Sequence, residues 1–395
     1  MRAMVRTAAV FVAALLWTAS SPDSVRAQEV TLDASAVEVD LSGRVQLQAA
    51  TSSCSSYPFE EGSPCTEQVP SLDLFTRRVR FSATVQINDF LSAKVEPDYG
   101  AVDGVTLRDA YGRLTFSDHA KVQVGQFKRP FDGFNLVSSS QLLTVERDVD
   151  VPGVPGLTAA SLGEFTSAFR LGSYDIGAML LGSAADGRLA YRAGVFNGEG
   201  SSASDDTNGG KQLVGRLTWR AVSGDLPLSI SAAAAWTDRP VRSPDDQPGT
   251  RLGSDHYGDF ELFAELGDYE PGPHVQAGLI FGDNPLQASD GTETGDAPLP
   301  TGLDYAGMHA WQAVGAWRFA LPGTAHLEAV EPAFRITRAE PNTDLEDDEV
   351  WAFTPGLNLY FFGRNKLQLN WDVATFAADG TDAVSSFKSQ FQVYF

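Results

Sequence analysis

Long hydrophobic runs are missing from most of this chain. Beyond residue 27, no segment approaches the ~20 consecutive apolar residues of a transmembrane helix. Positive charge is also scarce, because 29 lysines and arginines stand against 51 aspartates and glutamates, giving a formal net charge of -22. Such a chain does not bind nucleic acid through a basic patch. With 24 Phe, 10 Tyr and 7 Trp, it is not a disordered acidic protein either.

Residues that carry chemistry are few and scattered. Cys54 and Cys65 stand alone, and in an exported protein their spacing predicts one local disulfide that closes a loop, with a free thiol pair or a metal site as less favoured alternatives. The histidines lie far apart in the sequence: His119, His256, His274, His309 and His326. None belongs to a nucleophile motif, and neither a metal-ligand spacing nor a glycine-rich phosphate loop is present. We therefore expect no catalytic residues, no metal and no cofactor.

Residues 1–27 have the pattern of an export signal. Two arginines precede an apolar stretch over 7–19, and the segment ends in the small residue Ala27, as a signal peptidase requires. We expect cleavage after Ala27, which leaves 28–395 as the mature protein. The alternative of a single membrane-anchor helix is disfavoured because the apolar stretch is too short to span a bilayer.

Strict alternation of apolar and polar residues dominates the rest of the chain. In the last segment, Phe387, Phe391 and Phe395 share one face while Lys388 and Gln390 occupy the other. Such segments form strands with one apolar and one polar face, either in a soluble sandwich or in a membrane barrel. Most segments have nine or more residues, which is near the ~9–11 that cross a membrane when tilted and longer than typical sandwich strands.

The connections between these segments alternate between long and short, as in outer-membrane barrels. We predict strands near 36–49, 76–88, 91–99, 105–116, 121–127, 175–182, 188–197, 212–221, 228–236, 257–266, 274–282, 306–320, 325–337, 350–362, 366–375 and 385–395. The tryptophans outside the signal fall in the apolar sets, mostly near strand ends, as expected for interfacial girdles. The sequence thus predicts an all-β protein, a transmembrane antiparallel up-and-down β-barrel of about 16 strands. A count of 18 stays open because Phe165, Phe169 and Leu171 could begin another hairpin.

Several motifs resemble the phosphate-selective porin O and P family. They are Arg77-Arg78-Val79-Arg80-Phe81, Leu107-Arg108-Asp109-Ala110-Tyr111, Val124-Gly125-Gln126-Phe127-Lys128-Arg129-Pro130-Phe131, Glu146-Arg147, Asp175-Ile176-Gly177, Tyr191-Arg192-Ala193-Gly194-Val195-Phe196-Asn197-Gly198 and the terminal phenylalanine. The resemblance covers most of 75–215. It implies a trimer of sixteen-stranded barrels whose third extracellular loop, here about 128–163, folds into the pore and whose basic side chains select anions.

The expected pore-lining and anion-binding residues follow from the motifs and from the alternation together. The motifs contribute Arg78, Arg80, Arg108 and Arg192 on the polar face, and Lys128, Arg129 and Arg147 in the inward loop. Alternation adds Arg44, Lys94, Arg216 and Arg220. Guanidinium groups suit phosphate because their fork of donors matches its oxygens. Alternatively, many of these cations pair with acids on neighbouring strands and carry no selectivity.

The sequence therefore predicts an outer-membrane porin for passive diffusion of small solutes, with anions such as phosphate as candidate solutes. Expected partners are outer-membrane lipid, lipopolysaccharide and two further copies in a homotrimer. Acidic loop segments such as 345–349 would repel anions. A general or cation-preferring pore on the same scaffold is therefore an alternative, and a plugged structural or adhesin barrel is a weaker one. An outer-membrane hydrolase is the least favoured class.

Overall fold

The computed structural model describes residues 37–52, 71–100, 104–149, 161–198, 200, 210–241, 253–293, 299, 303–377 and 383–395. The expected signal peptide, together with Cys54 and Cys65 and their expected disulfide, lies outside the described residues. The barrel begins at Glu38 and is a unit of its own. No helix among the described residues is long and apolar enough to cross a membrane.

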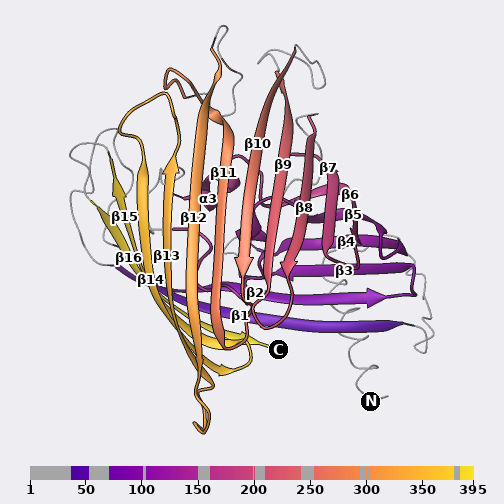
Figure 1. The fold of residues 1–395 in the computed structure, drawn as a ribbon, viewed down its shortest axis with the longest axis vertical. Coiled ribbons are helices and arrows are strands. Elements are labelled where there is room, and N and C mark those ends of the chain that lie inside the picture. Colours follow the sequence, from indigo (N-terminus) through magenta and orange to yellow (C-terminus); the bar gives the residue numbers. More distant parts are fainter. Residues whose placement is uncertain are drawn as a thin grey trace, which may run out of the picture. The chain divides into compact units, whose positions relative to one another are not determined.

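The described residues form sixteen antiparallel strands that close into one barrel (Figure 1). The strands are β1 (Glu38–Ser52), β2 (Ser71–Gln86), β3 (Leu91–Asp98), β4 (Thr106–Ser117), β5 (Ala120–Lys128), β6 (Tyr174–Ala184), β7 (Leu189–Phe196), β8 (Gln212–Val222), β9 (Leu228–Val241), β10 (Gly253–Leu266), β11 (Gly272–Ala288), β12 (Tyr305–Ala320), β13 (Ala329–Glu340), β14 (Val350–Phe362), β15 (Asn365–Phe376) and β16 (Val384–Tyr394). Each strand pairs with its neighbours in the chain, and β1 closes the ring against β16. The predicted sixteen-strand barrel is confirmed.

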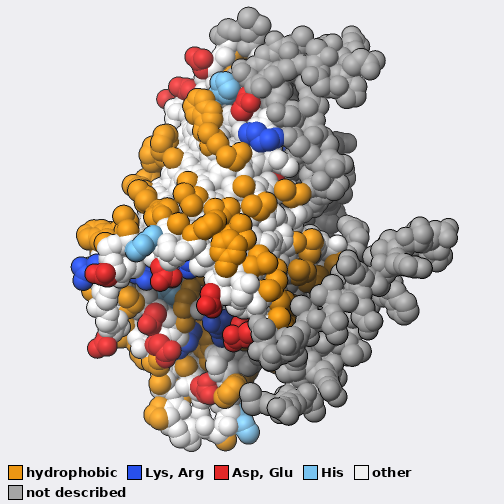
Figure 2. Space-filling view, turned by 90° about the vertical axis from the view of Figure 1, so that its right-hand side faces the viewer, with side chains coloured by type: hydrophobic (Ala, Val, Ile, Leu, Met, Phe, Trp, Pro, Cys, Tyr) orange, Lys and Arg blue, Asp and Glu red, His pale blue; other side chains and the backbone are white. Residues whose placement is uncertain are grey.

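The alternating apolar and polar residues of each strand point to the outside and the inside of the barrel, respectively. On β16, Phe391 is 45% exposed on the outer wall, whereas Gln390 and Gln392 are completely buried within the barrel. Figure 2 shows apolar side chains in a broad band across one face, with charged side chains above and below it. This is the pattern of a wall that faces hydrocarbon between two polar boundaries.

Two β-bulges change the alternation where arginines are densest. In the β1–β2 pair, Gln46 lies opposite Arg78 and Leu47 lies opposite Thr76, which leaves Arg77 as the extra residue. In the β3–β4 pair, Arg108 is left over in the same way. A bulge turns a side chain that strict alternation would send elsewhere. As a result, Arg77 and Arg78 both reach the same inward acid, Glu146.

The segment between β5 and β6 carries two short helices, α2 (Gly133–Leu136) and α3 (Leu162–Ala168), and α3 contacts β11, β12 and β13 (Figure 1). Phe165, Phe169 and Leu171, candidates for an extra hairpin, are instead buried around α3. They pack with Phe134, and Phe134 meets Phe263 of β10 edge to face at 5.1 Å. The inward face of the wall from β8 to β12 thus carries a buried apolar cluster beside polar groups such as Arg216, Glu261 and Gln312, unlike the uniformly polar lumen that alternation predicts.

Candidate functional site

The polar half of the lumen contains a cavity of about 380 Å³, lined mostly by β1 to β7 and by the segment after β5. Six cationic side chains line it: Arg44, Arg80, Lys94, Arg113, Lys128 and Arg192. Only two acids, Glu96 and Asp109, line it with them. We name this space the basic cavity. Five of its six cations belong to the predicted set, and the strand register brings them together across five strands.

Acidic partners compensate part of this charge. Arg44 binds Glu96 at 2.8 Å, and Lys94 binds Asp109 at 2.5 Å. Arg80 lies 2.6 Å from Asp98, which is not among the residues that line the cavity. These pairs hold the cations at fixed positions but cancel much of their field, as the pairing alternative in the sequence anticipates.

Two arginines of the basic cavity have no acidic partner among the described residues, namely Arg113 and Arg192. Arg113 donates two hydrogen bonds to the amide oxygen of Gln123, at 3.0 and 2.6 Å, and lies over the ring of Tyr111. Arg192 is exposed to the cavity and lies opposite Arg216 in the β7–β8 register. Arg216 forms an ion pair with Glu261 at 2.7 Å, so this nearby acid already has a cationic partner. The charge of Arg192 is therefore not balanced by an acid of the described residues.

Most of the other predicted residues lie outside the lining of the basic cavity. Arg129 is completely buried and binds Asp175 at 3.3 Å and Gln212 at 3.0 Å, so it does not face the basic cavity. Arg147 donates to backbone carbonyls of its own loop, and Arg78 binds Glu146. Arg108 lies 3.4 Å from Asp98, and Lys128 donates to the carbonyl of Asn135. Arg220 is exposed at the end of β8, away from these groups.

Side-chain amides and cations of one wall hold the carbonyl groups of residues 139–146. The donors come from β1 and from β13 to β16: Gln46 to Ser139 (3.0 Å), Gln392 to Ser140 (3.0 Å), Gln368 and Lys366 to Leu142 (3.1 and 2.6 Å), Asn358 to Leu143 (2.9 Å) and Arg335 to Glu146 (2.9 Å). On the opposite side, Glu261 of β10 accepts the backbone N–H groups of Asp132 and Gly133 at 2.9 and 2.6 Å. The segment is therefore tied to both walls.

Glu146 is the main charged attachment of this segment. Its carboxylate accepts from Arg77 at 2.7 Å, from Arg78 at 2.9 Å and from Gln48 at 2.7 Å. Burial by itself would raise the pKa of Glu146, but the charges of Arg78 and Arg77 and the hydrogen bonds from Arg77 and Gln48 hold that pKa well below its ordinary value. The carboxylate thus stays ionised at neutral pH.

Sequence reasoning missed several of these groups. Arg113 was overlooked although it lies two residues from Tyr111 on the same strand, where alternation would have found it. The roles of Glu146 and Arg77 had no local signal, because a bulge and a contact spanning 69 residues create them. In the part of the chain that the structure describes, no group of three or more His, Cys, Asp or Glu residues could hold a metal ion.

A closed sixteen-strand barrel with an apolar outer wall and a polar cavity inside defines the class, an outer-membrane porin. The chain is similar to OprB of Pseudomonas putida (TM-score 0.61, 10% identity, 90% of this chain and 94% of that chain). It is also similar to the outer membrane channel DcaP of Acinetobacter baumannii (0.56, 12%, 91% and 98%) and to OmpT of Vibrio cholerae (0.52, 13%, 91% and 98%). At such identities the likeness shows the fold alone. A search of curated proteins finds no match.

The family model of the phosphate-selective porins O and P matches residues 65–256. The resemblance that the arginine motifs indicate is therefore confirmed over this stretch. The protein is a porin of the bacterial outer membrane, and the matching family model and the fold point to a channel rather than an enzyme.

Proposed function

We propose that small anions, phosphate among them, diffuse passively through the basic cavity of this porin. The observation that carries this proposal is the balance of charge around the cavity, where six cations line the space and only two acids do. Cationic side chains on a pore wall lower the barrier for an anion. Among the arginines, Arg113 and Arg192 contribute most to the selectivity, because no acidic group among the described residues neutralises them.

The segment between β5 and β6 confines the path to this half of the barrel. Its aromatic side chains pack against apolar side chains on the inward faces of β8 to β12, and protein interiors of this kind are close-packed and exclude water. Ser138, Ser139 and Leu136 of the same segment form one side of the basic cavity. We therefore propose that this segment is the constriction of the pore, and that an anion passes it within reach of the unpaired arginines.

A cation-preferring pore is the alternative that a specific observation favours. Asp344, Glu346 and Asp347 are exposed on the connection between β13 and β14, and the whole chain carries a net charge of -22. An acidic entrance concentrates cations. At 0.1 M salt, however, exposed charges are screened over about 10 Å, so charges at the constriction dominate those of outer loops.

Reversal potentials in a salt gradient across a planar bilayer test the proposal. We expect anion selectivity in the wild type, and a shift toward zero in Arg113→Gln and Arg192→Gln, because each removes an uncompensated charge from the cavity. Arg220→Gln is the matched control, since it removes the same charge from an exposed position outside the cavity. Cation selectivity in the wild type, or equal shifts in all three variants, would reject the anion path.

Three further properties are proposed on the sequence and on the family resemblance. The mature chain begins at Gln28, which terminal sequencing of the exported protein checks. Cys54 and Cys65 form one disulfide, which the mass change on alkylation before and after reduction checks. Three copies assemble, which light scattering of the detergent-solubilised protein checks. A start upstream of Gln28, two reactive thiols or a monomer would each reject the corresponding proposal.

A further inference from the structure

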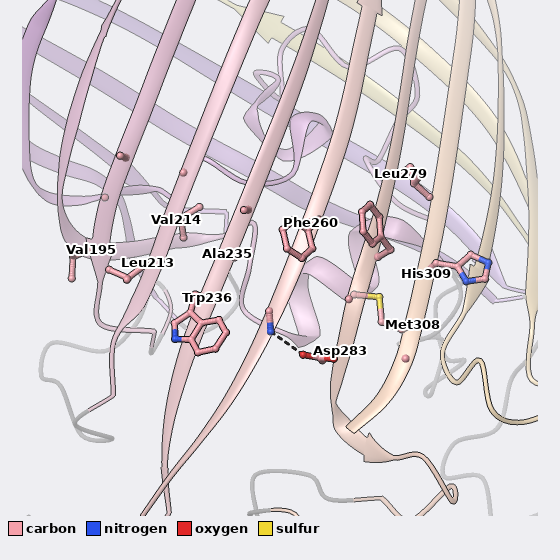
Figure 3. Close-up of a pocket in the computed structure, with 18 of the residues that line it drawn as sticks. Val195, Leu213, Val214, Ala235, Trp236, Phe260, Leu279, Asp283, Met308 and His309 are labelled. Atoms are coloured by element: carbon pink, nitrogen blue, oxygen red, sulfur yellow. Dashed lines mark hydrogen bonds between the residues drawn. The ribbon is translucent and has the colours of Figure 1, made fainter. Parts of the chain in front are cut away.

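The outer wall bears an apolar furrow across β6 to β12, with a volume of about 1310 Å³ (Figure 3). Small residues form its floor: Ala178, Ala193, Gly215, Ala234, Gly258 and Gly307. Larger side chains border it, and Leu213, Trp236 and Phe260 are each about half exposed. The volume exceeds the ~300–1,000 Å³ of ordinary ligand pockets, so the furrow has room for a long, flexible ligand.

The furrow is polar at one end. Asp283, His309 and Thr343 line it there, and Asp283 accepts the backbone N–H of Gly258 at 3.0 Å. His309 lies 2.9 Å from Arg338, which also binds Glu340 at 3.0 Å and Glu349 at 2.7 Å. Because short turns of outer-membrane barrels are periplasmic, the short turn between β10 and β11 places this polar end at the outer surface. The furrow therefore runs from the headgroup region into the hydrocarbon.

We propose that the furrow binds an outer-leaflet lipid, with an acyl chain along the floor of alanines and glycines and its polar headgroup at Asp283, His309 and Thr343. The furrow is continuous with the apolar wall. Because that wall faces hydrocarbon, lipid acyl chains are in contact with the furrow. The furrow is polar at one end and apolar along the rest, as a lipid has a polar headgroup followed by apolar chains. Trp236, stacked on His256 at 5.3 Å, marks the interfacial level beside it.

A second copy of this chain is a poorer occupant. The outward side chains of the barrel form a convex wall, which would bridge the rims of the furrow and leave its floor in a void. A void removes the van der Waals partners of the atoms that line it, so such a contact would be weak at its centre. A flexible acyl chain follows the floor and restores those contacts. The proposal requires the outer-membrane position of the barrel and is independent of its anion selectivity.

Native mass spectrometry of the full-length porin, refolded with defined lipids, tests the inference. Ala234→Leu fills the floor of the furrow, whereas Ala232→Leu adds the same bulk to an outward position of β9 beyond the furrow. Separate preparations with lipopolysaccharide, phosphatidylethanolamine or phosphatidylglycerol distinguish the source of the chain. We expect the wild type and Ala232→Leu to retain a lipid through detergent exchange, and Ala234→Leu to lose it.

Equal retention by all three proteins would overturn the inference. So would a fall in oligomer mass for Ala234→Leu with its lipid content unchanged, because the furrow would then be a contact between copies. The reversal potential of Ala234→Leu provides the folding control, since the furrow lies on the outer wall and the basic cavity lies within the barrel. We expect that potential to equal the wild-type value, whichever ion the pore prefers. An altered potential would show a disturbed barrel, and Ala193→Leu, also in the floor, then decides in its place.

Discussion

Replacing Glu146 by glutamine removes the charge that ties the β5–β6 segment to β2. The carboxylate binds Arg78 at 2.9 Å and Arg77 at 2.7 Å, and the side chains of Arg78 and Glu146 are only 4% and 9% exposed. Glutamine keeps the shape of the side chain, but it leaves two adjacent arginines facing each other without a counter-charge. Arg147, one residue along the chain, adds a third positive group that acts on Arg78.

The size of the effect follows from burial. Removing one partner of a buried ion pair costs about 3–5 kcal/mol, because the remaining charge is left desolvated. The contact with Arg77 adds ~1 kcal/mol or less, since that side chain is 40% exposed. The hydrogen bonds from Gln48 to Glu146 and from the amide ladder to the neighbouring carbonyls remain. A loss of about 3 kcal/mol raises the population in which the segment is detached by more than 100-fold.

Single-channel recordings in planar bilayers measure this detachment. We expect Glu146→Gln to show a larger and noisier open current than the wild type, and the double variant Glu146→Gln/Arg78→Gln to recover much of the steady current because the charge left unpaired is removed as well. Glu346→Gln, which deletes the same charge from an exposed loop, serves as the control. A steady wild-type current in Glu146→Gln would refute the claim that this ion pair fixes the segment.

Three other perturbations follow from the same structure. Because the pKa of Glu146 is lower in the folded protein than its ordinary value of 4.5, its stabilisation is complete above that pH and is lost progressively as the pH falls from there through the lower folded value; conductance noise at pH 6 should match that at pH 7. Phe391→Arg, on the lipid face, should destabilise the barrel by about 2–4 kcal/mol in urea titrations, whereas Ser82→Arg in the basic cavity should fold normally. Gly125→Ala should lower the free energy of unfolding by roughly 1–3 kcal/mol. Gly125 has a φ of 131°, and a Cβ there would lie 2.3 Å from the carbonyl oxygen of Ala110. An unfolding midpoint in urea equal to that of the wild type would contradict this backbone conformation.

The strands could be read from the sequence because their signal is local. Alternation of residues such as Phe387, Lys388 and Phe391 requires one face in hydrocarbon and one away from it, whatever the neighbouring strand is. All sixteen predicted strands therefore exist in the structure, most with ends that differ by a few residues. The region around Phe165 differs in its type of secondary structure. Its apolar residues allowed an additional hairpin, but they surround a short helix inside the barrel.

The candidate site was only partly predictable, because a residue's face does not tell which charges it meets. Alternation placed Arg44, Lys94 and Arg192 on the inner wall, and all three line the basic cavity. The resemblance placed Arg129 in the loop within the pore, yet that residue is buried against Asp175. Whether an arginine is neutralised or free depends on partners that lie tens to hundreds of residues away.

By itself the sequence determined that this chain is a barrel with an apolar outer wall, since the period-2 pattern and the lengths of the connections are properties of contiguous residues. The tertiary structure alone decided that an apolar cluster fills part of the lumen, that Arg77 and Arg78 converge on Glu146, and that Arg113 and Arg192 meet no acid within the described part of the chain. The physical reason is that these outcomes depend on strand register, on two bulges and on a segment that crosses the barrel, and each of these is settled by contacts between residues distant in the chain.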